Sequence, residues 1–200
     1  MERPDLWQIE REWLARDVRP ICGVDEAGAG PLAGRVYAAA VILPEGWDAP
    51  WLNDSKKVTE KRRETLYERI TAEASAWSVA WSDEKEIDRI NILNARMLAM
   101  ERAIQALSVR PALALIDGNR STGITCRNET VVKGDARSAS IAAASILAKV
   151  SRDRYMLEMA ERYPQYAFER HKGYPTRLHY ERLRTFGPCP IHRLTFLKKL

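Results

Sequence analysis

The sequence predicts an α/β fold, and two observations carry that prediction. Short runs rich in Val, Ile and Ala recur along the chain, as expected for strands that are covered on both faces. Longer segments with helical periodicity lie between these runs, and strands and helices mixed in this order indicate an α/β architecture. The chain has 200 residues, 46% of them hydrophobic, which is enough for one domain with a substantial core.

The expected strands are short and are bounded by turn residues. Trp77, Val79 and Trp81 alternate with small or polar neighbours, which is typical of a half-buried strand. In chain order, the expected strands cover residues 21–25, 35–43, 76–82, 112–117 and 124–133.

The expected helices follow from caps and apolar stripes. Asp83 and Glu86 have the spacing of a capping box and predict the start of a long helix, and Thr59 is a plausible N-cap for a shorter one. The four helices are expected near residues 59–74, 83–107, 138–162 and 176–186. We expect residues 1–165 to form the main domain and residues 166–200 a basic helical C-terminal segment.

The excess positive charge is concentrated in this C-terminal segment. The whole chain has a net charge of +5, whereas residues 166–200 hold eight Lys or Arg against two Asp or Glu. Basic residues interleaved with tyrosines suit a surface that faces a polyanion, although a solvated helix face is an equally simple explanation. Three widely spaced cysteines argue against a disulfide framework, and no apolar run is long enough to span a membrane. We therefore expect a cytoplasmic protein.

Four acids stand at the ends of predicted elements. Asp25 and Glu26 follow the first strand, Asp117 ends the fourth, and Asp135 precedes a helix. Ligand sites of α/β sheets gather at strand ends, and clustered carboxylates need a cation to offset their repulsion. Any one of these acids has an alternative role as a turn former or helix cap, above all Asp135. Together they predict an oxygen-ligated site for Mg²⁺ or Mn²⁺, suited to two-metal phosphodiester hydrolysis.

Motifs in nearly the whole chain resemble one known family. The acids Asp25 and Glu26 run into a glycine-rich loop, residues 28–34, and the chain then carries further motifs in the expected order. These motifs are Asp54-Ser55-Lys56-Lys57, Asn91-Ile92-Leu93, Asp117-Gly118-Asn119, Lys133-Gly134-Asp135, His171-Lys172-Gly173-Tyr174 and Ile191-His192-Arg193. The sequence resembles ribonuclease HII, the type 2 ribonuclease H.

The resemblance implies a fold, an activity and a set of site residues. It implies a ribonuclease H-like mixed five-stranded sheet flanked by helices, with a small helical C-terminal segment that completes the substrate cleft of the catalytic domain. It implies a monomeric, metal-dependent endonuclease that acts on RNA–DNA hybrids and nicks 5′ of ribonucleotides embedded in duplex DNA, as in ribonucleotide excision repair. The products would carry 3′-hydroxyl and 5′-phosphate ends. Asp25, Glu26, Asp117 and Asp135 match the metal-binding carboxylates of the family.

Substrate contacts are expected from the loop and from basic residues. The backbone of Gly28, Ala29 and Gly30 can approach a ribose 2′-hydroxyl closely, because glycine has no Cβ. By the resemblance, Tyr174 stacks on the sugar at the RNA–DNA junction, although a half-buried loop tyrosine is the alternative. Phosphate contacts are expected from Lys56, Lys57 and Lys172, which otherwise serve only as solvated charges.

The loop also departs from the family. Ala29 stands where the family usually has Arg, so we expect retained chemistry with weaker substrate binding. Two alternative functions remain open at this stage. One is a catalytically weakened protein that binds RNA–DNA hybrids, and the other is a different ribonuclease H-like DNA nuclease.

Overall fold

The computed structural model describes residues 5–49, 51–53 and 55–198; Asp54 and the side chain of Lys57 lie outside this part. A mixed five-stranded sheet with strand order β3-β2-β1-β4-β5 forms the centre of the molecule. Strands β1, β2 and β3 pair antiparallel, whereas β4 runs parallel to β1 and β5 parallel to β4. The strands are β1 (Ile21–Ala27), β2 (Val36–Ile42), β3 (Ala76–Ser82), β4 (Leu113–Asp117) and β5 (Asn128–Val131). The predicted α/β fold with a mixed five-stranded sheet is confirmed.

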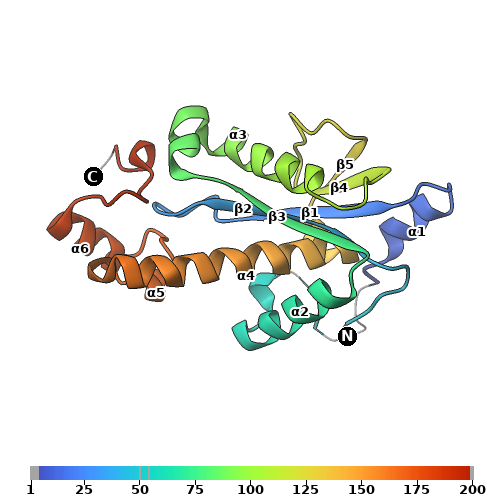
Figure 1. Cartoon of the computed structure of the whole chain (residues 1–200), viewed down its shortest axis with the longest axis horizontal. Coiled ribbons are helices and arrows are strands. Elements are labelled where there is room, and N and C mark those ends of the chain that lie inside the picture. Colours follow the sequence, from blue (N-terminus) through green and yellow to red (C-terminus); the bar gives the residue numbers. More distant parts are fainter. Residues whose placement is uncertain (1–4, 50, 54, 199–200) are drawn as a thin grey trace.

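Helices cover both faces of this sheet (Figure 1). Helix α3 packs on one face, and α4, with α2 beside it, packs on the other. The helices are α1 (Gln8–Leu14), α2 (Glu60–Glu73), α3 (Glu84–Gln105), α4 (Ala139–Arg162), α5 (Phe168–His171) and α6 (Arg177–Phe186). Short 3₁₀ turns lie at Ser55–Lys57, Gly134–Ala136, Pro164–Tyr166 and Leu194–Phe196.

Helix α4 lies unusually close to strand β1. A Cβ atom added at Gly23 would fall 2.1 Å from the backbone carbonyl carbon of Ser140, so glycine permits this approach. The helix contributes a row of small, fully buried residues that includes Ala142, Ala143 and Ala144. This close contact fixes the start of α4 next to the strand that carries Asp25 and Glu26.

Most elements agree with the sequence prediction. Strand β3 has the predicted bounds, and the Asp83 capping box is formed, with the Glu86 N–H donating to Oδ1 of Asp83 at 2.8 Å. Thr59 occupies the N-cap position of α2, although its side chain makes no cap hydrogen bond. Strand β5 is shorter than expected at both ends, because only Asn128–Val131 pair with β4.

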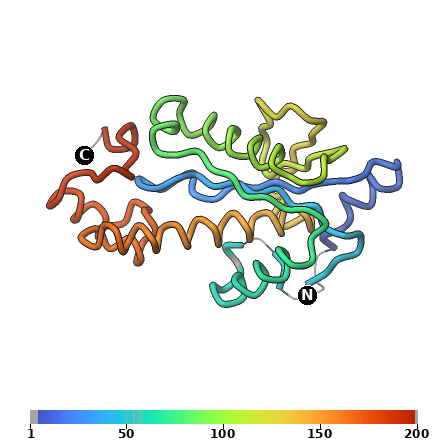
Figure 2. The backbone as a smooth tube through the Cα atoms, viewed as in Figure 1, coloured from blue at the N-terminus to red at the C-terminus, as the bar shows by residue number. Residues whose placement is uncertain are grey.

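The C-terminal segment packs against the loop that joins β1 to β2. Helices α5 and α6 lie at the end of the sheet where this hairpin turns (Figure 2). The Leu32 N–H donates to the carbonyl of Gly173 at 2.8 Å, and the Gly34 N–H donates to that of Ile191 at 2.8 Å. The division into residues 1–165 and 166–200 stays a prediction.

Candidate active site

The sheet register places the four predicted acids around one point. Val24 of β1 is the partner of Ile116 of β4. The next residue of each strand, Asp25 in β1 and Asp117 at the end of β4, therefore lies at the same edge of the sheet. Oδ1 of Asp117 accepts hydrogen bonds from the N–H groups of Gly134 at 2.7 Å and Asp135 at 3.4 Å. These bonds attach the turn that carries Asp135 to the end of β4. The tertiary fold therefore brings together residues that are far apart in sequence.

Asp25 is the most strongly perturbed of these acids. Its side chain is buried, and burial raises the pKa of this carboxyl well above the usual value, with the charges of Glu26, Asp117 and Asp135 adding to the shift. The pKa of Glu26 is also raised, first by burial, while Arg96 and Lys56 oppose the shift. Buried carboxylates that repel one another gain from a cation, and their oxygens are the ligands that Mg²⁺ and Mn²⁺ prefer. The donor set fits such an ion.

The carboxylates have protein partners in this structure. Nη1 of Arg96 lies 3.1 Å from Oε1 of Glu26, and Oδ1 of Asp25 accepts from the Glu26 N–H at 2.7 Å. In the described part of the chain, no three Asp, Glu, His or Cys side chains are arranged as a ready metal-binding group. Metal ligation by all four acids therefore requires adjustment of their side chains.

The glycine-rich loop beside the acids is held by a buried arginine. The Arg193 guanidinium donates to the carbonyl oxygens of Gly28 at 2.6 Å and Ala29 at 3.0 Å. It also donates to the carbonyls of Pro31 at 2.8 Å and Gly34 at 2.7 Å. Burial lowers the pKa of Arg193 to about 9. The Arg193 side chain thus turns the carbonyls of the loop toward the interior of the protein.

The backbone N–H groups of this loop remain available as hydrogen-bond donors. Among the residues that the structure describes, no acceptor bonds the N–H groups of Ala29 and Gly30. Gly28 has a φ of +95°, and a Cβ there would fall 2.0 Å from Nε of the buried Arg152. Only glycine fits this position without displacing Arg152. The loop therefore presents backbone donors next to the acidic cluster.

Tyr174 lies against the same loop. Its Cε1 would be 4.0 Å from a Cβ built on Gly30, and the side chain is 41% exposed. The Arg152 guanidinium lies 5.6 Å from the Tyr174 ring centroid. The ring is thus fixed on one side and accessible on the other, as a stacking platform requires.

Three buried histidines support the segment that carries Tyr174. The Cys189 N–H donates to Nδ1 of His192 at 2.9 Å, so Nε2 of His192 bears the proton that it donates to Nε2 of His179 at 3.0 Å. Nδ1 of His179 then donates to the Tyr174 carbonyl at 3.0 Å. Burial lowers the pKa values of His179 and His192 to about 4. This chain of bonds requires neutral imidazoles, so these histidines position the loop.

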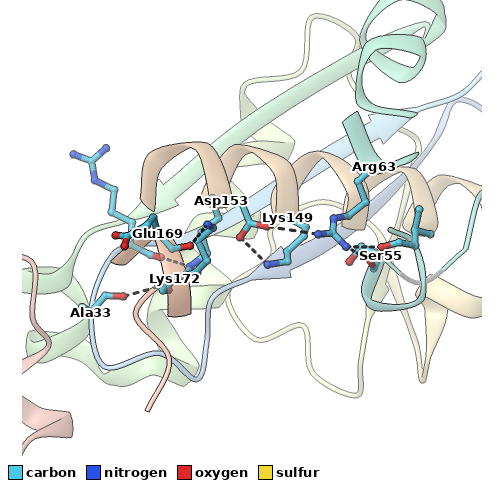
Figure 3. A network of polar contacts seen from close by, with 10 residues as sticks. Ala33, Ser55, Arg63, Lys149, Asp153, Glu169 and Lys172 are labelled. Carbon is cyan, nitrogen blue, oxygen red and sulfur yellow. Dashed lines mark hydrogen bonds and ion pairs between the residues drawn. The ribbon is translucent and has the colours of Figure 1, made fainter. Parts of the chain in front are cut away.

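The predicted phosphate-binding lysines are not all in one place. Lys56 is exposed and close enough to Glu26 to lower the pKa of that carboxyl. Lys172 lies beside Arg152 of α4, whose Nη2 donates to the Lys172 carbonyl at 3.0 Å, and Nζ of Lys172 donates to the Glu169 carbonyl at 2.7 Å (Figure 3). The side chain of Lys57 lies outside the described residues.

Two further basic residues, Lys149 of α4 and Arg63 of α2, share one carboxylate. Nζ of Lys149 lies 2.6 Å from Oδ1 of Asp153, and Arg63 reaches the other oxygen of that carboxylate at 3.9 Å (Figure 3). Asp153 thereby joins α2 and α4 and holds two cations on one surface.

Comparison with known proteins decides the family. The model of the family described as "Ribonuclease HII" matches residues 22–199. The chain belongs to the ribonuclease HII family. It is 50% identical over 199 residues to the ribonuclease HII of Caldicellulosiruptor bescii, covering 100% of this chain and 97% of that protein. It is 53% identical over 193 residues to the ribonuclease HII of Endomicrobium trichonymphae, covering 96% of this chain and 92% of that protein.

Solved structures of ribonucleases share the fold. The ribonuclease H2 of Pyrococcus horikoshii OT3 matches with a TM-score of 0.69 and 25% identity, over 88% of this chain and 92% of that one. The ribonuclease HII of Archaeoglobus fulgidus, solved in a complex with PCNA, matches with a TM-score of 0.73 and 24% identity, over 90% and 95%. The resemblance stated from the motifs is therefore confirmed.

Sequence reasoning missed three residues of this ribonuclease HII site. Arg96, Arg152 and Arg193 each bond or pair with a site residue, and the last two are almost fully buried. Arg193 stood in a quoted motif without a role. A buried arginine is rare, but only the tertiary structure shows which arginines are buried.

Proposed function

We propose that Asp25, Glu26, Asp117 and Asp135 hold divalent cations with which this ribonuclease HII hydrolyses the RNA strand of RNA–DNA hybrids. The family cleaves the RNA of such hybrids and nicks at ribonucleotides, and its members are hydrolases. The observation that carries the residue assignment is the position of Asp25, buried among three other carboxylates at the edge of the sheet. A hybrid-binding protein without activity is not favoured, since all four acids are present.

The four acids bind the metal ions, and the loop recognises the substrate. Bound divalent ions would supply an activated water and a counter-charge for the leaving oxygen. Asp25 and Asp117 lie at the same edge of the sheet and would hold the ions that position the scissile phosphate. The turn held by Asp117 presents Asp135 to the same place. Glu26, whose Oε1 pairs with Arg96, would also hold an ion. The oxygen ligands suit both Mg²⁺ and Mn²⁺.

The loop selects the ribonucleotide. Only the 2′-hydroxyl distinguishes a ribonucleotide from a deoxyribonucleotide at a given position. The N–H groups of Ala29 and Gly30 lie in the loop that directly follows the metal-binding acids, so recognition of the sugar and hydrolysis of its phosphate are linked. Tyr174 stacks on the neighbouring sugar at the RNA–DNA junction. Lys56, Lys57 and Lys172 bind the backbone phosphates.

We further expect this chain to act in the cytoplasm as a monomer. In the part of the chain that the structure describes, no helix is long and apolar enough to cross a membrane. Sedimentation of the purified protein at two concentrations tests the monomer.

The experiment that tests the assignment uses a DNA duplex that contains one ribonucleotide. The wild-type chain should nick 5′ of the ribonucleotide in Mg²⁺ or Mn²⁺ but not in EDTA, and the products should carry 3′-hydroxyl and 5′-phosphate ends. Asp117→Asn should abolish the nick while leaving the protein folded. Asp17→Asn is the matched control, because Asp17 is exposed and its φ of +57° suits Asn. Full activity in Asp117→Asn would overturn the metal-site assignment.

A further inference from the structure

Helix α1 contributes a buried acid to the start of helix α4. Glu10 is 2% exposed and belongs to α1, which lies at the end of the sheet where β1 begins (Figure 1). Its Oε1 accepts hydrogen bonds from Oγ of Ser138 at 2.6 Å and from N and Oγ of Ser140 at 3.0 and 2.6 Å. Between these serines, the Ala139 N–H donates to the Leu6 carbonyl at 2.8 Å. The segment before β1 therefore holds the first residues of α4.

The serines held by Glu10 are connected to the turn that carries Asp135. The Ser138 N–H donates to the Gly134 carbonyl at 2.8 Å. The Gly134 N–H in turn donates to Oδ1 of Asp117 at 2.7 Å. A series of hydrogen bonds therefore runs from Glu10 through Ser138 and Gly134 to one of the acids proposed as metal ligands, and Asp135 lies within the turn that these bonds hold.

This turn also packs directly against the first turn of α4. A Cβ atom added at Gly134 would fall 2.5 Å from Cδ1 of Ile141 and 3.2 Å from Oδ1 of Asp117. Ile141 is fully buried, and its N–H donates to Oγ of Ser138 at 3.2 Å. Since the contact leaves no room for a side chain, a shift in the first turn of α4 also moves the residues around Asp135.

Stability alone does not explain an acid at this position. Ser138 already supplies the N-cap of α4, as serine commonly does. Behind it, Oε2 of Glu10 is buried without a hydrogen-bond partner in the described part of the chain. No ion pair within the same ranges includes Glu10. Burying a carboxylate in this way has a free-energy cost that an apolar side chain avoids, so the cost indicates a role in positioning.

We propose that Glu10 is a positioning residue of the nuclease site, because it fixes the start of α4 and thereby the turn that presents Asp135 to the metal ions. The inference rests on the proposed metal site. Glu10 contacts neither the substrate nor an ion; it holds Ser138 in the place from which the backbone of that residue supports Gly134. Groups that orient a metal ligand from behind commonly change metal affinity by about 10- to 100-fold.

Binding of Mn²⁺ to the full-length protein without substrate tests this role. Glu10→Ala leaves the donors of Ser138 and Ser140 without their acceptor and should weaken binding by about 10-fold, measured by calorimetry. Glu10→Gln keeps an oxygen for these donors and should stay within about twofold of wild type. Glu10→Asp keeps the carboxylate but is one methylene too short, so it should resemble Glu10→Ala. Weak binding in Glu10→Gln with wild-type binding in Glu10→Asp would assign the effect to charge and overturn the proposal.

Amide hydrogen exchange measures the turn itself, without metal or substrate. The Gly134 N–H should exchange about 10-fold faster in Glu10→Ala than in wild type, whereas the N–H of Leu115 in β4 should be unchanged. Trp7→Phe is the matched control, because it removes a bond of 2.8 Å from Nε1 to the Trp47 carbonyl at the same helix. It should lower stability but leave Mn²⁺ binding and exchange at Gly134 unchanged. Equal effects of Glu10→Ala and Trp7→Phe would show a merely structural role.

Two further variants make the outcome decisive. If Glu10→Ala does not fold, Ser138→Ala breaks the same connection from the other side and should also weaken Mn²⁺ binding and speed exchange at Gly134. Asp117→Asn tests the metal site separately. Loss of Mn²⁺ binding and nicking in Asp117→Asn, with wild-type Mn²⁺ binding in Glu10→Ala or in its substitute Ser138→Ala, would overturn the role of Glu10 alone. An Asp117→Asn protein that binds Mn²⁺ and nicks like wild type would overturn the metal site, and the role of Glu10 with it.

Discussion

Arg193 donates a hydrogen bond of 2.6 Å to the carbonyl of Gly28, and so joins the C-terminal segment to the loop beside the four clustered acids. The same guanidinium holds three further carbonyls of that loop. The shape of the loop therefore depends on residues near the C-terminus as much as on its own glycines.

Replacing Arg193 with Lys should damage both stability and activity. Lysine is a point charge and cannot reproduce the planar set of donors, so several buried carbonyls lose their partners. We expect the free energy of unfolding to fall by about 3 kcal/mol, and kcat/KM for a single-ribonucleotide duplex to fall with it. Denaturant unfolding and nicking assays check this. Arg184→Lys on the exposed face of α6 is the control, and an Arg193→Lys protein as stable as that control would contradict the role of Arg193.

Substitutions at Tyr174 should distinguish the contribution of its ring to activity from that of its hydroxyl. Tyr174→Phe keeps the stacking surface and should retain most of the activity. Tyr174→Ala should lower kcat/KM by about 10-fold or more, since stacking of an aromatic ring in nucleic-acid binding is worth about 1–3 kcal/mol. Steady-state nicking of the single-ribonucleotide duplex measures both. Equal activity of the Ala and Phe variants would show that the ring does not contact substrate.

Introducing an arginine at Ala29 should strengthen substrate binding. The Ala29 carbonyl is held by Arg193, so the loop backbone is fixed independently of the side chain. A charge-assisted contact from Ala29→Arg to a substrate phosphate is worth about 1.5–3 kcal/mol, or roughly 10-fold or more in kcat/KM. Ala29→Gln matches much of the added length without charge and should give no such gain. If kcat/KM of Ala29→Arg does not exceed that of Ala29→Gln, the expected phosphate contact is wrong.

Arg96 should oppose metal binding through its pairing with Glu26. Removing this cation in Arg96→Gln frees Glu26 and increases the negative potential at the cluster. The Mg²⁺ concentration that gives half-maximal activity should therefore fall several-fold, on the order of 1 kcal/mol in binding. Activity titrations with Mg²⁺ measure this shift. Arg89→Gln, on an exposed position of the same helix, is the control and should leave the titration unchanged.

The buried histidines should make the protein less stable in mild acid. The folded pKa of His179 and of His192 is about 4, below the unfolded value of about 6.5. The unfolded chain therefore takes up protons first as the pH falls through 6.5, and stability is lost from there down to about pH 4, with no further loss from these groups below. At about 1.4 kcal/mol per pKa unit, we expect a loss on the order of 3 kcal/mol for each ring.

Two measurements check the histidine prediction. Urea unfolding at a series of pH values should show the free energy of unfolding decreasing from pH 6.5 downward. NMR titration of the ring protons should show both histidines still neutral at pH 5.5. Ring midpoints near 6.5 would contradict the assignment of neutral, position-fixing histidines.

The sequence alone predicted the α/β fold and most element positions, because local patterns determine them. Val, Ile and Ala runs define the strands, the alternation around Val79 defines β3, and the Asp83 capping box begins α3. Helix α1 was not predicted, although Ile9, Trp13 and Leu14 have helical spacing and pack against one core cluster. The non-helical Asn91 inside α3, with a φ of +64°, was not predicted either, although Asn suits such a break: its Oδ1 accepts from the Asn94 N–H at 3.1 Å and so caps the rest of the helix.

The four acids proposed as metal ligands could be picked out from the sequence itself, since their residue types, positions near strand ends and motifs are all local. Only the tertiary structure decided how they relate: the register of β1 against β4 brings Asp25 and Asp117 together, and burial raises the pKa of Asp25. The tertiary structure also assigned the arginines, because a guanidinium becomes a positioning group only when the surrounding fold buries it and supplies carbonyls within reach. Burial and long-range proximity depend on packing between distant segments, and no local pattern encodes them.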